Sequence, residues 1–93
     1  METAIKVNFK KDGKATSTTL NYNICKMYCF MLNESKEHEK YNTYRDFVKK
    51  KIQEFVNEFS KYCENNNFTN LLNRDYIEFE LLSCIKANNP RLF

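Results

Sequence analysis

The spacing of apolar and polar residues changes from that of a strand to that of a helix within the first third of the chain. Residues 4–9 alternate apolar and polar side chains, and this period of two predicts a strand. Residues 15–20 are rich in threonine, whose branched side chain also favours a strand. Asp12-Gly13 lies between them and is typical of a tight hairpin turn. Two arrangements stay open: the segments pair as a hairpin, or the first is a basic arm and only the second is a structural strand.

Two helices are expected after these strands, each with a polar residue that can cap its start. The first follows Asn21 or Asn23, and its apolar residues cover most of its circumference. The second begins after Thr43, because Thr43 and Asp46 have the spacing of a capping box, and it runs to about Cys63 with one apolar face.

The last third of the chain holds two shorter segments. The asparagines within residues 64–67 end the second helix, since asparagine tolerates turn conformations. Residues 68–73 form a short piece, and residues 75–87 suit a helix better than a strand, although residues 76–81 also alternate. We therefore expect a mostly α fold with a short N-terminal β element and C-terminal helices.

The length predicts one domain, residues 1–93. We divide it into an N-terminal strand or basic arm (1–13), a strand-helix-helix core (14–63) and a C-terminal helical extension (64–93). A chain of this size buries only about 60–65% of its unfolded surface. Because 15% of the residues are aromatic, burial between two copies of the chain is a natural expectation.

The composition argues against catalysis, cofactors and membrane insertion. The chain has one histidine and one glycine, with no glycine-rich phosphate loop and no nucleophile beside a recognisable base, so we expect no enzyme activity, cofactor or metal site. It also lacks an apolar run that would span a membrane and the apolar region of a signal peptide. We expect a cytoplasmic protein whose four cysteines are reduced, buried thiols.

The net charge of +3 permits nucleic-acid binding but does not argue for it alone. The placement of the basic residues is more informative, because they gather in two clusters. The first cluster is Lys6, Lys10, Lys11 and Lys14, and the second is Arg45, Lys49, Lys50 and Lys51.

The run Ser17-Thr-Thr-Leu-Asn21, followed by an apolar helix, a turn and a capped second helix, resembles the ribbon-helix-helix DNA-binding family of the Arc, MetJ and CopG type. Leu20 and Ile24 keep the family's spacing between strand and first helix, and the resemblance covers residues 14–59. In this family two chains intertwine, and their strands pair into one antiparallel ribbon that enters the major groove. The resemblance therefore implies a ribbon-helix-helix-like core formed by an intertwined dimer.

The resemblance also implies roles for single residues. Alternate strand residues share a face, so the strand residues on the side away from Leu20 would contact bases, and the free N–H groups that begin the second helix would bind phosphate. The base contacts would be Ala15, Ser17 and Thr19. The phosphate contacts would be Lys14, Asn42, Thr43, Tyr44, Arg45 and Lys49. The dimer core would be Leu20, Ile24, Met27, Tyr28, Met31, Val48, Ile52 and Phe55.

The sequence departs from the family at three points, and the first is Ala15, which stands where many members place a long polar side chain that contacts bases. The inward strand residues Thr16 and Thr18 are less apolar than those of the family, and the connection between the helices is longer and carries acids. Residues 4–9 and 64–93 lie outside the motif. Residues 64–93 would stack on the dimer core, join dimers into a higher oligomer or contact a protein partner.

These observations lead to two main functional hypotheses. A third, a structural subunit or toxin-neutralising partner, shares the dimer but uses the C-terminal residues. The preferred one is sequence-selective binding of double-stranded DNA by a homodimer, as a transcriptional repressor or as an accessory factor at a plasmid or phage DNA site. The alternative is a small α+β protein-binding module, such as a phage-encoded inhibitor of a host enzyme or defence complex. Asp12-Gly13 separates them, because a tight turn there would pair residues 5–9 with 15–20 in one chain and occupy an edge of the strand that the dimer ribbon needs.

Overall fold

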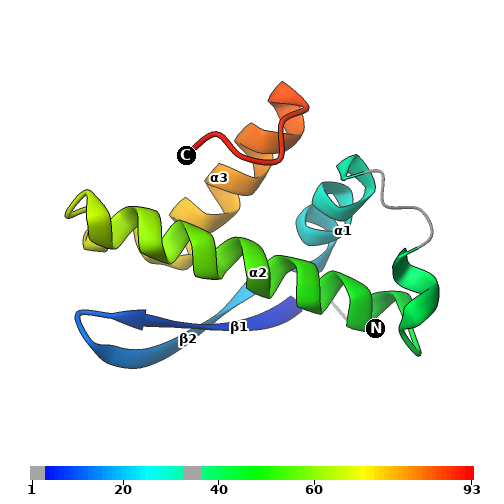
Figure 1. The fold of residues 1–93 in the computed structure, drawn as a ribbon, viewed down its shortest axis with the longest axis horizontal. Coiled ribbons are helices and arrows are strands. Elements are labelled where there is room, and N and C mark those ends of the chain that lie inside the picture. Colours follow the sequence, from blue (N-terminus) through cyan, green and yellow to red (C-terminus); the bar gives the residue numbers. More distant parts are fainter. Residues whose placement is uncertain (1–3, 33–36) are drawn as a thin grey trace.

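The chain folds as a two-stranded antiparallel hairpin followed by three α-helices, an α+β arrangement (Figure 1). The computed structural model describes residues 4–32 and 37–93. The strands are β1 (Ala4–Lys11) and β2 (Lys14–Asn21), and the α-helices are α1 (Tyr22–Met31), α2 (Tyr44–Asn65) and α3 (Arg74–Ala87). Two short 3-10 helices, η1 (Glu37–Lys40) and η2 (Thr69–Leu71), precede α2 and α3. Part of the turn expected between the first two helices, residues 33–36, lies outside the described residues.

The hairpin closes through a two-residue turn at Asp12 and Gly13. Both residues have positive φ, 54° and 80°, as the favoured two-residue hairpin turn requires. Lys11 faces Lys14 across the turn, and the register continues to Ala4 opposite Asn21. Of the two arrangements that the sequence left open, the hairpin is therefore confirmed, and the free basic arm is wrong. One edge of β2 is occupied by β1 of the same chain.

Helix α2 lies along β1 and covers the inner face of the hairpin (Figure 1). Ile5 and Val7 of β1 are fully buried there, together with Val48 and Ile52 of α2. Helix α3 packs against α1 and reaches β2. The segment expected at residues 75–87 is therefore a helix, despite the alternation of residues 76–81. Its buried residues Ile77, Leu81 and Cys84 belong to the same hydrophobic core as those of the hairpin, α1 and α2.

A single chain buries most of the residues that were assigned to a dimer core. Leu20, Tyr28, Val48, Ile52 and Phe55 are all buried, and Ile24 and Met31 are partly buried against the same cluster. Met27 differs, because its side chain is 45% exposed. Helices α2 and α3 of the same chain therefore cover much of α1, although Phe30 is 67% exposed, and the intertwined dimer stays a prediction.

The helix caps fall where the sequence places them. The Asn21 side chain accepts a hydrogen bond from the Ile24 N–H at 3.2 Å, and the Thr43 hydroxyl accepts one from the Asp46 N–H at 3.1 Å. These bonds satisfy N–H groups that have no partner inside their own helix.

The C-terminal segment returns from α3 to α2 (Figure 1). The Tyr28 hydroxyl donates to the Pro90 carbonyl at 2.8 Å, and Arg91 pairs with Glu58 of α2 at 2.6 Å. The Phe93 ring packs against Phe55 with centroids 5.3 Å apart. Residues 90–93 therefore pack over the core of the same chain, and Phe93 and Phe55 are aromatic residues that this packing uses.

Candidate nucleic-acid interface

The net charge of the chain resides in the hairpin. Residues 4–21 contain four lysines and one aspartate, so the hairpin carries +3, which is the net charge of the whole chain. The remaining residues balance, with eleven basic and eleven acidic side chains. A local excess of positive charge attracts polyanions, so the hairpin is the part of the molecule best suited to meet one.

The outer face of the hairpin is polar, exposed and without an acidic residue. On β1 the inner residues Ile5, Val7 and Phe9 are buried, while the residues between them point to solvent. The register sets Lys10 opposite Ala15, Asn8 opposite Ser17 and Lys6 opposite Thr19. We call these six residues the outer face: Lys6, Asn8, Lys10, Ala15, Ser17 and Thr19.

The strand residues expected to contact bases thus lie together on one exposed face. Leu20, Thr18 and Thr16 were expected to point toward the helices. Leu20 is buried as expected, but Thr18 is only half-buried and Thr16, nearer the turn, is exposed. Helix α2 lies along β1 and covers Val7 and Phe9, which face Thr18 and Thr16, while the inward side of β2 is less covered near the turn. Sequence reasoning missed Lys6, Asn8 and Lys10 as members of this face. The alternation of residues 4–9 together with Asp12-Gly13 contained the signal that identifies them.

Side chains of α2 hold the edge of β1 that β2 leaves free. Gln53 accepts a hydrogen bond from the Asn8 N–H at 3.0 Å and donates one to the Asn8 carbonyl at 2.7 Å. Arg45 donates to the Ala4 carbonyl at 3.0 Å, and the Ser60 hydroxyl lies 3.5 Å from the Lys10 carbonyl. These contacts fix the hairpin to the longest helix of the protein.

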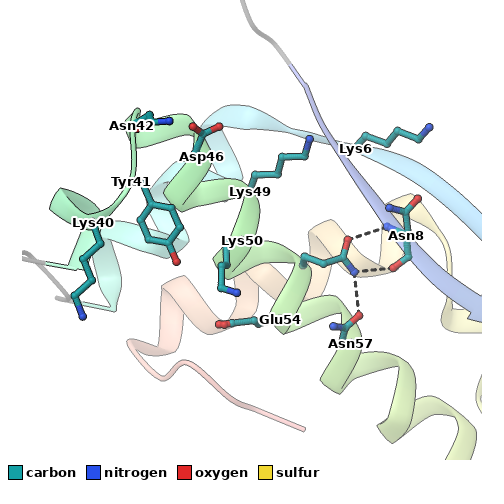
Figure 2. A pocket seen from close by; sticks show the side chains of 11 residues that line it. Lys6, Asn8, Lys40, Tyr41, Asn42, Asp46, Lys49, Lys50, Glu54 and Asn57 are labelled. Carbon is teal, nitrogen blue, oxygen red and sulfur yellow. Dashed lines mark hydrogen bonds between the residues drawn. The ribbon is translucent and has the colours of Figure 1, made fainter.

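A shallow groove of about 710 Å³ runs between β1, the start of α2 and the segment before it (Figure 2). Four lysines line it, against the two acids Asp46 and Glu54. The lysines are Lys6, Lys40, Lys49 and Lys50. A second hollow of about 620 Å³ beside Lys10, Ala15 and Ser17 shares Asn8, Gln53 and Asn57 with the first. The groove and the outer face are therefore continuous, and most of the side chains that line them are polar or charged.

The residues expected to contact phosphate separate into two groups. Asn42 and Lys49 line the groove, and Lys14 is exposed beside the hairpin turn. Thr43 is exposed, but its hydroxyl already caps α2. Asn42 and Lys49 thus lie at the groove, Lys14 lies beside the hairpin turn, and Thr43 directly follows Asn42 in the chain.

Arg45 and Tyr44 have structural contacts instead. The guanidinium of Arg45 donates a hydrogen bond to the main-chain carbonyl of Ala4, and it lies 5.6 Å from the ring centroid of Tyr22. The ring of Tyr44 packs between Phe30 and Phe47, and burial raises the pKa of its hydroxyl. We therefore remove both from the candidate phosphate contacts, because their side chains are committed to packing α2.

The four cysteines are buried, as the sequence predicts. Burial raises the pKa of the Cys25 thiol to about 12 and that of Cys63 to about 11, so both stay neutral near pH 7. Within residues 4–32 and 37–93, no group of three His, Cys, Asp or Glu side chains is placed to hold a metal ion. No helix in the same residues has the length and apolar content needed to cross a membrane.

No family model, curated protein or solved structure matches the chain. The resemblance to the ribbon-helix-helix family, the homodimer and the protein partner for residues 64–93 therefore stay predictions.

Proposed function

We propose that the chain binds double-stranded DNA through the outer face of its hairpin. The observation that carries this proposal is the concentration of the net charge in residues 4–21, on a hairpin whose outer face has no acidic residue. The major groove of B-DNA is about 12 Å wide and admits a two-stranded ribbon. Paired strands lie only about 4.8 Å apart, so one hairpin fits the groove without a second chain.

The surface next to the hairpin supports contacts to the DNA backbone. Lys6 and Lys10 lie at the two ends of the outer face, and Lys49, Lys50 and Asn42 line the adjoining groove. Ammonium and amide groups beside a ribbon are suited to phosphate oxygens, which fix the register of a protein on the duplex. Ala15, Ser17 and Thr19 would then face the base edges, where hydroxyls accept or donate hydrogen bonds and the threonine methyl meets that of thymine.

This form of the proposal differs from the intertwined family ribbon in one respect. The two strands that enter the groove are β1 and β2 of one chain, so the chain does not need a partner to build the ribbon. Occupation of a DNA site by such a protein would act as repression or as accessory assembly at a plasmid or phage site. That output is supported by the family resemblance alone.

The alternative function, a protein-binding module, is favoured by a separate observation on α3. Tyr76, Phe79 and Leu82 are 48%, 64% and 42% exposed and follow one another at helical spacing. Exposed apolar side chains that gather on one surface commonly mark contacts with other proteins. This surface lies in the C-terminal extension and is distinct from the cationic hairpin.

Titration of a labelled random-sequence duplex at several salt concentrations tests the DNA proposal. We expect the logarithm of the affinity to fall linearly with the logarithm of the salt concentration, by about 0.9 per neutralised phosphate. Lys6→Gln/Lys10→Gln should reduce that slope by about 2. Lys61→Gln/Lys86→Gln, which removes two exposed lysines elsewhere, is the matched control and should leave the slope nearly unchanged. If the folded protein binds no duplex at low salt, the proposal is wrong.

A further inference from the structure

Asn8 occupies the centre of the outer face. It lies opposite Ser17 and is separated by one inward residue from Lys6 on one side and from Lys10 on the other. Asn8 is exposed, and within the described part of the chain no hydrogen bond is recorded for its side-chain amide. Its main-chain N–H and carbonyl, in contrast, are both bound by Gln53.

Gln53 holds Asn8 as a neighbouring strand would, with one accepted and one donated hydrogen bond. The same Gln53 Nε2 also donates to the side-chain oxygen of Asn57, one turn further along α2, at 2.9 Å. The main-chain N–H and carbonyl of Asn8 fix which end of the Gln53 amide is the donor, and the contact with Asn57 agrees with that orientation. Figure 2 draws these bonds at Asn8 and Asn57 as dashed lines, beside the lysines that line the groove.

The main chain of Asn8 is therefore held in place, while its side-chain amide is free to bind a ligand. Because the backbone of residue 8 is bound on the α2 side by Gln53 and lies between two strand neighbours, its Cα–Cβ direction is set by the fold. Its neighbours on β2 are the small residues Ala15, Ser17 and Thr19. The Asn8 amide is therefore the longest uncharged group on the outer face.

The chemistry of a primary amide matches one base edge in the major groove. Adenine presents an acceptor at N7 and a donor at its N6 amino group, and an asparagine side chain binds both at once. Lys6 and Lys10 stand about 6.8 Å along the strand on either side, where their ammonium groups reach toward phosphates while the amide reaches the base.

We propose that Asn8 recognises an adenine in the major groove and that Gln53 is the positioning residue that aims it. This inference rests on the proposed DNA binding and adds to it the residue that selects sequence. The purely structural alternative is that Gln53 only covers the free edge of β1 and that Asn8 contacts water.

The test begins with selection of preferred duplexes from a random pool by the wild-type protein. Affinities are then measured for the selected duplex and for every single-base change in it. Asn8→Ala should reduce the preference for adenine at one base pair by about 5- to 150-fold, and it should leave the salt slope unchanged. Lys6→Gln is the matched control, because loss of a phosphate contact weakens all duplexes alike and lowers the salt slope by about 1.

A duplex with 7-deazaadenine at that base pair separates recognition from structure. This base lacks the N7 acceptor, so it should weaken binding of the wild-type protein and leave Asn8→Ala unaffected. Gln53→Met, which cannot form the two hydrogen bonds to Asn8, should lose part of the preference at the same base pair only. If Gln53→Met does not fold, Asn8→Ala still decides, because the Asn8 side chain takes no part in those main-chain bonds.

The outcomes distinguish the two proposals. Salt-dependent binding with an adenine preference that Asn8→Ala does not change overturns the inference and leaves the proposed function standing. Salt-dependent binding without any sequence preference likewise overturns the role of Asn8 and leaves the proposed DNA binding standing. Absence of binding to every duplex overturns the proposed function, and the inference falls with it.

Discussion

Glu78 of α3 accepts a hydrogen bond from the main-chain N–H of Asn21, at 2.6 Å, where β2 passes into α1. Asn21 caps α1 with its side chain, so one residue joins the hairpin, the first helix and the third helix. Arg74 lies 3.5 Å from the same carboxylate, one turn before it on α3. The hairpin is therefore held at this end by α3, as it is held along β1 by α2.

Glu78→Ala should destabilise the protein by about 1.5–3 kcal/mol, because it removes a charged acceptor and leaves a half-buried N–H without its partner. Urea unfolding followed by circular dichroism measures the change. Glu64→Ala, an exposed acid on α2, is the control and should stay within about 0.5 kcal/mol of the wild type. Equal stability of the two variants would show that the Glu78 contact does not support the fold.

Gly13→Ala should cost about 1–2 kcal/mol, because residue 13 has a φ of 80° that side chains with a Cβ adopt poorly. No heavy atom lies within 4 Å of the place where a Cβ would stand, so the cost comes from the backbone alone. Asp12→Asn, which keeps a residue suited to this turn, should be nearly neutral. Thermal or urea unfolding compares the two, and a neutral Gly13→Ala would exclude the observed turn.

Phe93→Ala should destabilise the protein more than Arg91→Ala. The partly buried Phe93 ring packs on Phe55 and Phe59, with centroids 5.3 and 5.5 Å away, and its loss should cost about 1–3 kcal/mol. Arg91 pairs with Glu58 at an exposed site, where ion pairs contribute about 1 kcal/mol or less. Unfolding at low and high salt checks both, since only the Arg91 effect should shrink as salt rises. The reverse order would show that the C-terminal segment does not close the core.

The raised thiol pKa values predict a loss of stability in alkali. Cys25 and Cys63 have folded-state pKa values of about 12 and 11, while unfolded thiols ionise near their ordinary value of 9.0. Below pH 9 both states hold their protons, so these thiols add no pH dependence. As the pH rises above 9, only the unfolded state loses protons and stability falls. Unfolding free energies between pH 7 and 10.5, with Cys25→Ala as comparison, measure this: the variant should show a shallower decline. If stability falls equally in Cys25→Ala and in the wild type, groups other than the Cys25 thiol cause the loss of stability in alkali.

The local features of the fold were predictable from the sequence. Asp12-Gly13, Asn21 and Thr43 act through their own backbone neighbourhoods, and such signals are visible in a short stretch of residues. The second helix, expected from Thr43 to about Cys63, runs over Tyr44–Asn65 for the same reason.

The errors concern contacts between distant segments. Arg45 was expected at phosphate, but α2 lies along β1 and brings its guanidinium to Ala4, 41 residues away. The single-chain core was missed because Phe93 returns to Phe55, a contact that no local period reveals. The alternation of residues 4–9 already places Asn8 on the outer face, and only its link to Gln53 depends on how α2 packs.

Residue-resolved mapping of duplex binding tests the central claim most directly. In a titration of ¹⁵N-labelled protein with a short duplex at low salt, the amide signals of Lys6, Asn8, Ser17 and Lys49 should shift or broaden. The signals of Phe79 and Leu82 on α3 should stay in place. Shifts confined to α3, or no shifts at all from the folded protein, would contradict binding of DNA by the hairpin.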